Sequence, residues 1–275
     1  MWMNFFYEND IITITRGDYM TDWNLDGVND YGTLVDRAKE MCRARVREGS
    51  YGNAKIKYID CDTWLTDKCN EINLWTYWQG HGLTDFSDVK IMLVGQDWGS
   101  EKFEADSIKR IQEIQNGERD IDYDENMNSP TNIKLCKLFL HIGHDYDLSK
   151  SHSDLFFTNY SLGYRRDSET GNMTKALLRQ DKEAFETLVK IVQPRVIICL
   201  GKLVSEMVLG QTIKGFIKRL KAGMILSYDY PANSKIKVYC VGHCGKRGVS
   251  NRGGIKSMEE DWIRIAEDMR RNNLI

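Results

Sequence analysis

Four short runs of apolar residues punctuate the chain after residue 85: Val89–Val94, Leu155–Thr158, Val196–Leu200 and Ile236–Val241. Each run is nearly continuous in apolar residues and is followed by a glycine or an asparagine. A strand that is covered on both faces of a sheet has this appearance, whereas a strand with one solvated face alternates between apolar and polar residues. The four runs therefore predict buried strands.

Between and after these runs, apolar residues recur with helical spacing. The predicted helices are Thr131–Ile142, Thr174–Val192, Lys202–Leu209, Ile213–Leu220 and Ser257–Arg271. Strands that alternate with helices are typical of a parallel sheet with helices on both faces. We expect a three-layer α/β/α fold with a central four-stranded, mainly parallel sheet.

The first 84 residues follow a different pattern. Ile11–Thr15 alternates like a strand, while Thr33–Glu48 and Thr63–Tyr77 predict helices. The chain has only three prolines, which disfavours a proline-rich linker. We expect a single domain over 1–275, in which 1–84 is a largely helical extension packed on an α/β core formed by 85–275.

Charge is unevenly distributed along the chain. The formal net charge is −2, yet residues 202–256 contain eleven basic and two acidic residues. Such a region suits a face that meets phosphate, and it equally suits a set of solvated helix faces. Charge alone leaves both interpretations open.

Composition disfavours a metal or disulfide protein. The seven cysteines are irregularly spaced and include no CxxC pair, so we expect no disulfide framework, zinc site, iron–sulfur cluster or other cofactor. The acidic stretch Asp120–Asp124 lacks the glycine and glutamate of a calcium loop and predicts a solvated loop. No apolar run approaches the ~20 residues of a membrane span, and the N-terminus does not resemble a signal peptide, so we expect a cytoplasmic protein with no membrane partner.

Candidate chemistry follows directly after three of the four predicted strands. Ligands bind outside the carboxyl ends of parallel strands, and there the sequence places Gln96 and Asp97, then Asn159, then His243. A carboxylate can orient or deprotonate water, an amide can read a base edge, and a histidine can donate to a developing anion. Each also has a structural alternative: a helix cap for the aspartate, a turn residue for the asparagine, and a satisfied buried group for the histidine. The Gly201–Lys202 pair after the third strand is interpreted as a simple turn from strand to helix.

The order of these motifs resembles the uracil-DNA glycosylase superfamily. VKIMLVGQDWG (residues 89–99) is similar to the first signature of those enzymes, and LFFTNYSLGYRR (155–166) to the strand that ends in the uracil-reading asparagine. VYCVGHCGKRGVSNRGG (238–254) is similar to the final signature, which precedes a DNA-penetrating loop. The resemblance implies that Asp97 positions the attacking water, that Asn159 and the Gln96 backbone bind the base, and that His243 stabilises the departing base.

The chain departs from the family pattern at two places. Trp98 and Gly99 stand where the family has Pro-Tyr, and the resemblance then implies weaker exclusion of thymine; Trp98 and Phe103 are the candidates to stack on the base. His-Pro-Ser is replaced by His243–Gly245. The implied DNA-binding residues are Ser161 and, in or beside a penetrating loop over Gly245–Asn251, Lys246, Arg247, Arg252 and the apolar wedge Val249.

Three functions remain in competition. The first is a monomeric, cofactor-free DNA glycosylase that flips out and hydrolytically removes uracil or a related deaminated base during base excision repair. The second is a module of the same fold that binds a nucleobase, nucleotide or DNA without cleavage. The third, an unrelated α/β hydrolase or nucleotide-binding enzyme, is disfavoured because the sequence contains no GxSxG or P-loop motif.

Overall fold

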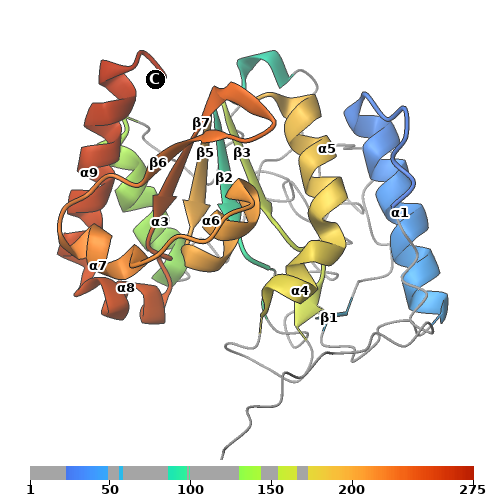
Figure 1. The fold of residues 1–275 in the computed structure, drawn as a ribbon, viewed down its shortest axis with the longest axis horizontal. Coiled ribbons are helices and arrows are strands. Elements are labelled where there is room, and N and C mark those ends of the chain that lie inside the picture. Colours follow the sequence, from blue (N-terminus) through green and yellow to red (C-terminus); the bar gives the residue numbers. More distant parts are fainter. Residues whose placement is uncertain are drawn as a thin grey trace, which may run out of the picture.

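A computed structural model describes residues 23–48, 56–57, 86–97, 99, 130–143, 154–165 and 173–275 (Figure 1). Its centre is a five-stranded sheet in the order β3-β2-β5-β7-β6. The strands are β2 (Ile91–Gly95), β3 (Leu155–Asn159), β5 (Val196–Leu200), β6 (Ser227–Tyr230) and β7 (Asn233–Val241). Neighbouring pairs among β3, β2, β5 and β7 are parallel, so their carboxyl ends lie at one edge of the sheet.

The fifth strand, β6, corrects the predicted strand count of four. It pairs antiparallel with β7 at the outer edge of the sheet. Its sequence is SYDY, and only Tyr230 of the four residues is buried. An edge strand with one covered face needs no continuous apolar run, so the pattern that reveals the four inner strands does not reveal β6.

Helices cover both faces of the sheet, and strand side chains alternate between two cores. Met92 and Val94 pack in the core beneath α1 (Tyr31–Glu48), α5 (Lys182–Val192), α6 (Lys202–Leu209) and α7 (Phe216–Lys221). Ile91 and Leu93 point the other way, into the core beneath α3 (Pro130–His141) and α9 (Ile255–Arg271). Figure 1 shows α1 and α5 on one side of the strands and α9 on the other. The α/β class and the largely parallel, doubly covered sheet are as the sequence predicts.

The predicted helix over 174–192 is divided in three. Thr174 caps α4 (Lys175–Leu178), whose first turn donates from the Leu177 amide to the threonine hydroxyl at 3.2 Å. A 3-10 turn, η6 (Arg179–Asp181), then leads into α5. The break places the Asp181 carboxylate inside the protein, where it accepts hydrogen bonds from Ser161 and Leu162 in the segment that follows β3.

The described part of the N-terminal region packs on the core. Leu34 and Ala38 of α1 are fully buried, the Trp23 indole donates to the Gln180 carbonyl at 2.8 Å, and Lys190 on α5 donates to Asn29 at 3.1 Å. A short antiparallel pair joins β1 (Ile56–Lys57) to β4 (Tyr164–Arg165). The predicted strand Ile11–Thr15 and helix Thr63–Tyr77 lie outside the described residues.

The remaining described elements are the 3-10 turn η3 (Phe86–Asp88), which precedes β2, and α8 (Lys246–Arg252), which follows β7. No helix in the described ranges combines the length and the apolar character that a bilayer crossing requires.

Candidate functional site

A cleft of about 740 Å³ opens at the carboxyl ends of β2, β5 and β7. Its lining includes Gln96, Asp97, Gly99 and His243. The parallel pairing of β2 with β5 and of β5 with β7 brings these residues together, although Asp97 and His243 are 146 positions apart in the chain. The cleft therefore occupies the sheet edge at which open α/β folds bind ligands.

The Asp97 carboxylate is held by three donors. Its Oδ1 accepts from the Gly99 amide at 2.7 Å and from the Arg165 Nε at 2.9 Å, while Oδ2 accepts from the Gln96 side chain at 2.6 Å. The Asp97 side chain is 4 % exposed and that of Arg165 is 12 % exposed. Fixed donors and low exposure leave this carboxylate little freedom to rotate. Oδ1 already accepts two of these bonds, so Oδ2 is the oxygen that can accept a further one.

The His243 ring is fixed as a hydrogen-bond donor toward the cleft. Its Nδ1 accepts from the Gly245 amide at 2.9 Å, so the proton of the neutral ring resides on Nε2. His243 is an exposed residue that lines the cleft, and the backbone at Gly201 and Gly245 approaches its side chain closely. Burial lowers the pKa of His243 from 6.5; Asp97 opposes this shift, and Arg165 adds to it. A neutral imidazole with Nε2–H exposed can donate to an oxygen that gains negative charge.

Glycines allow the backbone to close around His243. A side chain at Gly248 would collide with the His243 carbonyl, and one at Gly245 would lie 2.9 Å from two ring atoms. Gly201 has φ +104°, a conformation that L side chains rarely adopt, and its missing Cβ would lie 3.5 Å from the His243 Cβ. Gly201 and Lys202, which the sequence analysis interprets as a simple turn from strand to helix, are thus both part of the cleft wall.

Asn159 lies at the same sheet edge but does not line the cleft. It pairs in register with Gly95, and its side chain covers that glycine so closely that a Cβ there would collide with its Oδ1. Asn159 is 6 % exposed. The amide is therefore adjacent to Gln96 and next to the cleft, and the three expected residues divide into two that line the cleft and one beside it.

Ser161 does not reach the surface expected of a DNA contact. It is fully buried, and its hydroxyl donates to Asp181 Oδ2 at 3.1 Å. The same carboxylate oxygen accepts from the Leu162 amide at 2.9 Å. Ser161 thus anchors the segment after β3 to the start of α5.

The segment expected to be a penetrating loop is the helix α8. Its first residues, Lys246 and Arg247, are exposed and line the cleft, and their role as phosphate contacts stays a prediction. Val249 instead packs partly buried against the core shared with α9, because a helix turns this position inward. An apolar wedge over Val249 is therefore not presented by this conformation.

Arg252 corrects the expected set of phosphate contacts. It is 4 % exposed, and its guanidinium forms two hydrogen bonds to the Asp261 carboxylate, one of them 2.9 Å long. A buried arginine that is satisfied in this way ties α8 to α9 and is not available to a DNA backbone.

Arg165 is the residue of the cleft that sequence reasoning missed. It lies within the LGYRR stretch, and its backbone amide donates to the Gly99 carbonyl at 2.7 Å, which brings it beside Asp97. A basic residue seven positions after the end of the predicted strand Leu155–Thr158 was the only available signal. The candidates Trp98 and Phe103 and the Asp120–Asp124 stretch lie outside the described residues. Within the described ranges, no group of three or more histidine, cysteine, aspartate or glutamate side chains is arranged to hold a metal ion.

Comparisons with known proteins add no family assignment. No protein-family model matches the chain, and no curated protein matches its sequence.

Proposed function

We propose that this protein is a DNA glycosylase that hydrolyses the bond between deoxyribose and uracil, or a related deaminated base. The observation that carries the proposal is the pairing of a fixed carboxylate, Asp97, with a neutral imidazole donor, His243, in one cleft. Glycosidic cleavage develops positive charge on the sugar and negative charge on the departing base. A carboxylate and an Nε2–H donor stabilise these two charges respectively.

The remaining cleft residues fit the same reaction. A base must leave the duplex stack to reach such a site, at a cost of a few kcal/mol. Lys246 and Arg247 at the rim would contact phosphates and help to offset that cost. Gly99 lines the cleft and stands where the resembling family carries a tyrosine, which supports a range of bases wider than uracil.

A second function is favoured by the Asp97–Arg165 ion pair. Both oxygens of the carboxylate already accept hydrogen bonds, which leaves little acceptor capacity for this carboxylate to act as the base toward water. A protein that binds a nucleobase or DNA without cleaving it needs no such base. The alternative proposal is therefore a glycosylase-like binding module.

Strand scission after alkali treatment distinguishes the two proposals. The chain is incubated with labelled oligonucleotides that contain U·G, U·A, single-stranded U, hypoxanthine or T·G, and abasic sites are then cleaved. We expect scission of at least one substrate and a loss of about 100-fold or more in Asp97→Asn, since positioned acid–base groups contribute on the order of 10²–10⁴ in rate.

The matched control is Asp229→Asn, which changes a 58 % exposed carboxylate on β6, at the far edge of the sheet. It should cleave like the unmodified protein. Absence of scission on every substrate, with DNA binding retained, would reject the glycosylase and support the binding module.

A further inference from the structure

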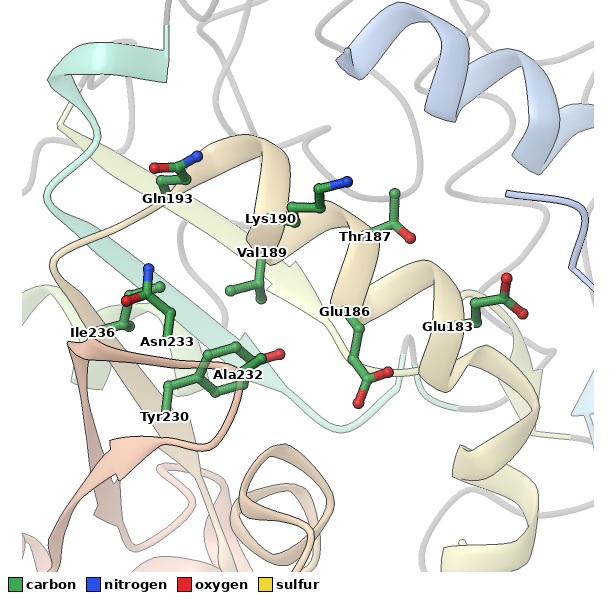
Figure 2. Close-up of a pocket in the computed structure, with 10 residues that line it drawn as sticks. All are labelled: Glu183, Glu186, Thr187, Val189, Lys190, Gln193, Tyr230, Ala232, Asn233 and Ile236. Carbon is green, nitrogen blue, oxygen red and sulfur yellow. The ribbon is translucent and has the colours of Figure 1, made fainter. Parts of the chain in front are cut away.

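A second cavity, of about 570 Å³, lies between α5 and the turn that joins β6 to β7 (Figure 2). Its volume falls within the range of small-molecule sites. It lies near Asn233, where β7 begins, whereas the cleft lies just beyond Val241, where β7 ends. At ~3.3 Å per residue the two sites are roughly 25 Å apart. The cavity therefore belongs to the opposite, amino edge of the sheet.

Tyr230 contributes a hydroxyl that faces this cavity. The residue as a whole is 5 % exposed. Figure 2 shows the hydroxyl directed toward Glu186 across the cavity. A molecule that enters the cavity can therefore form a hydrogen bond with this oxygen.

Glu186 brings negative charge to the same place. Burial is the main cause that raises the pKa of Tyr230, and the charge of Glu186 raises it further. The same two causes, in the same order, raise the pKa of Tyr160, which packs behind α5 against Phe185. Lys182 approaches Glu186 at 3.5 Å, but both side chains are about half exposed, and such a pair is weak.

The other charged residues of the lining do not oppose Glu186 inside the cavity. The Lys190 ammonium donates to Asn29 at 3.1 Å and is directed toward α1. Glu183 points away from Tyr230 in Figure 2. Val189 and Ile236, both nearly fully buried, provide an apolar wall. One carboxylate, one phenol and an apolar wall thus face each other.

We propose that this cavity binds a small organic ammonium ion. The ammonium would donate to the Glu186 carboxylate and to the Tyr230 oxygen, and the alkyl body would lie on Val189 and Ile236. An ammonium has three donors and no acceptor, which matches the two acceptor groups, a carboxylate and a phenol oxygen. An anion would be repelled by Glu186, and a bare divalent cation would require more oxygen ligands than these.

Calorimetric titration of the full chain with n-butylammonium chloride tests the proposal. Butan-1-ol and butyrate are the matched probes, since they share the alkyl body and lack the positive charge. We expect butylammonium to bind with millimolar or better affinity, and both other probes to bind at least about tenfold more weakly, because a hydrogen bond to a charged group contributes about that factor.

Two variants locate the binding site. Glu186→Gln should weaken butylammonium binding at least about tenfold, and Tyr230→Phe should weaken it by a smaller factor, since it removes one acceptor. Glu183→Gln is the matched control on the same helix and should bind like the unmodified chain. Circular dichroism and thermal melting verify that all three variants are folded.

Three results would overturn the proposal. They are the absence of butylammonium binding, equal binding of butan-1-ol, and an equal loss in Glu183→Gln and Glu186→Gln, which would indicate general attraction to an acidic helix.

Discussion

At the scale of single residues, the cleft depends on side chains whose orientation is set by a neighbouring backbone amide. The Gly99 amide fixes Asp97, and the Gly245 amide fixes His243. In both cases a glycine two positions later in the chain supplies the donor. The chemical role of each side chain is therefore decided by local geometry that extends over three residues.

The protonation of His243 gives a prediction at this scale. Nuclear magnetic resonance titration should show His243 with a midpoint below 6.5 and with the Nε2–H tautomer when neutral, because burial and the Gly245 amide both favour the neutral ring. Below pH 6.5 the unfolded chain then binds more protons than the folded one, so His243 lowers the stability as the pH falls.

Gly245→Ala provides the comparison for this titration. Its added Cβ would lie 2.9 Å from the ring, so the ring must rotate away from the amide. The His243 midpoint should then move back toward 6.5, with a mixture of tautomers. An unchanged midpoint and tautomer in this variant would show that the amide does not control the ring.

At the scale of elements, α8 carries much of the cleft. It begins directly after Gly245, presents Lys246 and Arg247 to the cleft, and is tied to α9 by the buried Arg252–Asp261 pair. Gly248, in its first turn, passes the His243 carbonyl with no room for a side chain. The contact between one helix and one strand end thus positions both the histidine and the basic rim.

Gly248→Ala is the prediction at this scale. The added methyl group must displace α8 or the His243 backbone, so we expect a loss of about 1–3 kcal/mol in the free energy of unfolding, the usual range for overpacking. Denaturant unfolding measures this loss.

Gly32→Ala is the matched control for this substitution. Gly32 lies in the first turn of α1, and a Cβ there would meet only Asp30 Oδ1, at 3.5 Å. We expect this variant to be neutral or more stable, by up to about 1 kcal/mol. Equal stability of the two variants would contradict the close approach of α8 to His243.

At the scale of the whole molecule, the sheet separates two sites of different character. The carboxyl edge holds the cleft with Lys202, Lys246 and Arg247, and the amino edge holds the cavity with Glu186 and Tyr230. The protein is nearly neutral overall, with a net charge of −2. A DNA strand should therefore be attracted to the carboxyl edge of the sheet, where these basic residues lie.

Salt dependence of DNA binding tests this placement. Lys246→Ala/Arg247→Ala should bind a uracil-containing duplex more weakly and reduce the slope of log K against log[salt] by about 2, because each phosphate contact releases nearly one counterion. Arg195→Ala/Lys235→Ala removes the same charge from exposed positions near the amino edge and is the control. Equal losses in the two double variants would show that binding follows total charge and has no preferred edge.

The sequence by itself determined the strand-and-helix alternation, because continuous apolar runs and helical periodicity are consequences of burial on both faces of a sheet. It indicated Asp97 and His243 for the same reason, since polar residues that directly follow buried strands must lie at a sheet edge. Strand β6 was not predicted, because an edge strand needs no continuous apolar run.

Only the tertiary structure decided which polar residues face the cleft. Arg165 lies beside Asp97 because its amide bonds to the Gly99 carbonyl, Arg252 turns inward to Asp261, and Val249 packs on the core because its segment is a helix. The Tyr230–Glu186 cavity likewise joins a helix to a hairpin that lies more than forty residues later. Contacts between elements distant in the chain set these orientations, and no local pattern of apolar and polar residues records them.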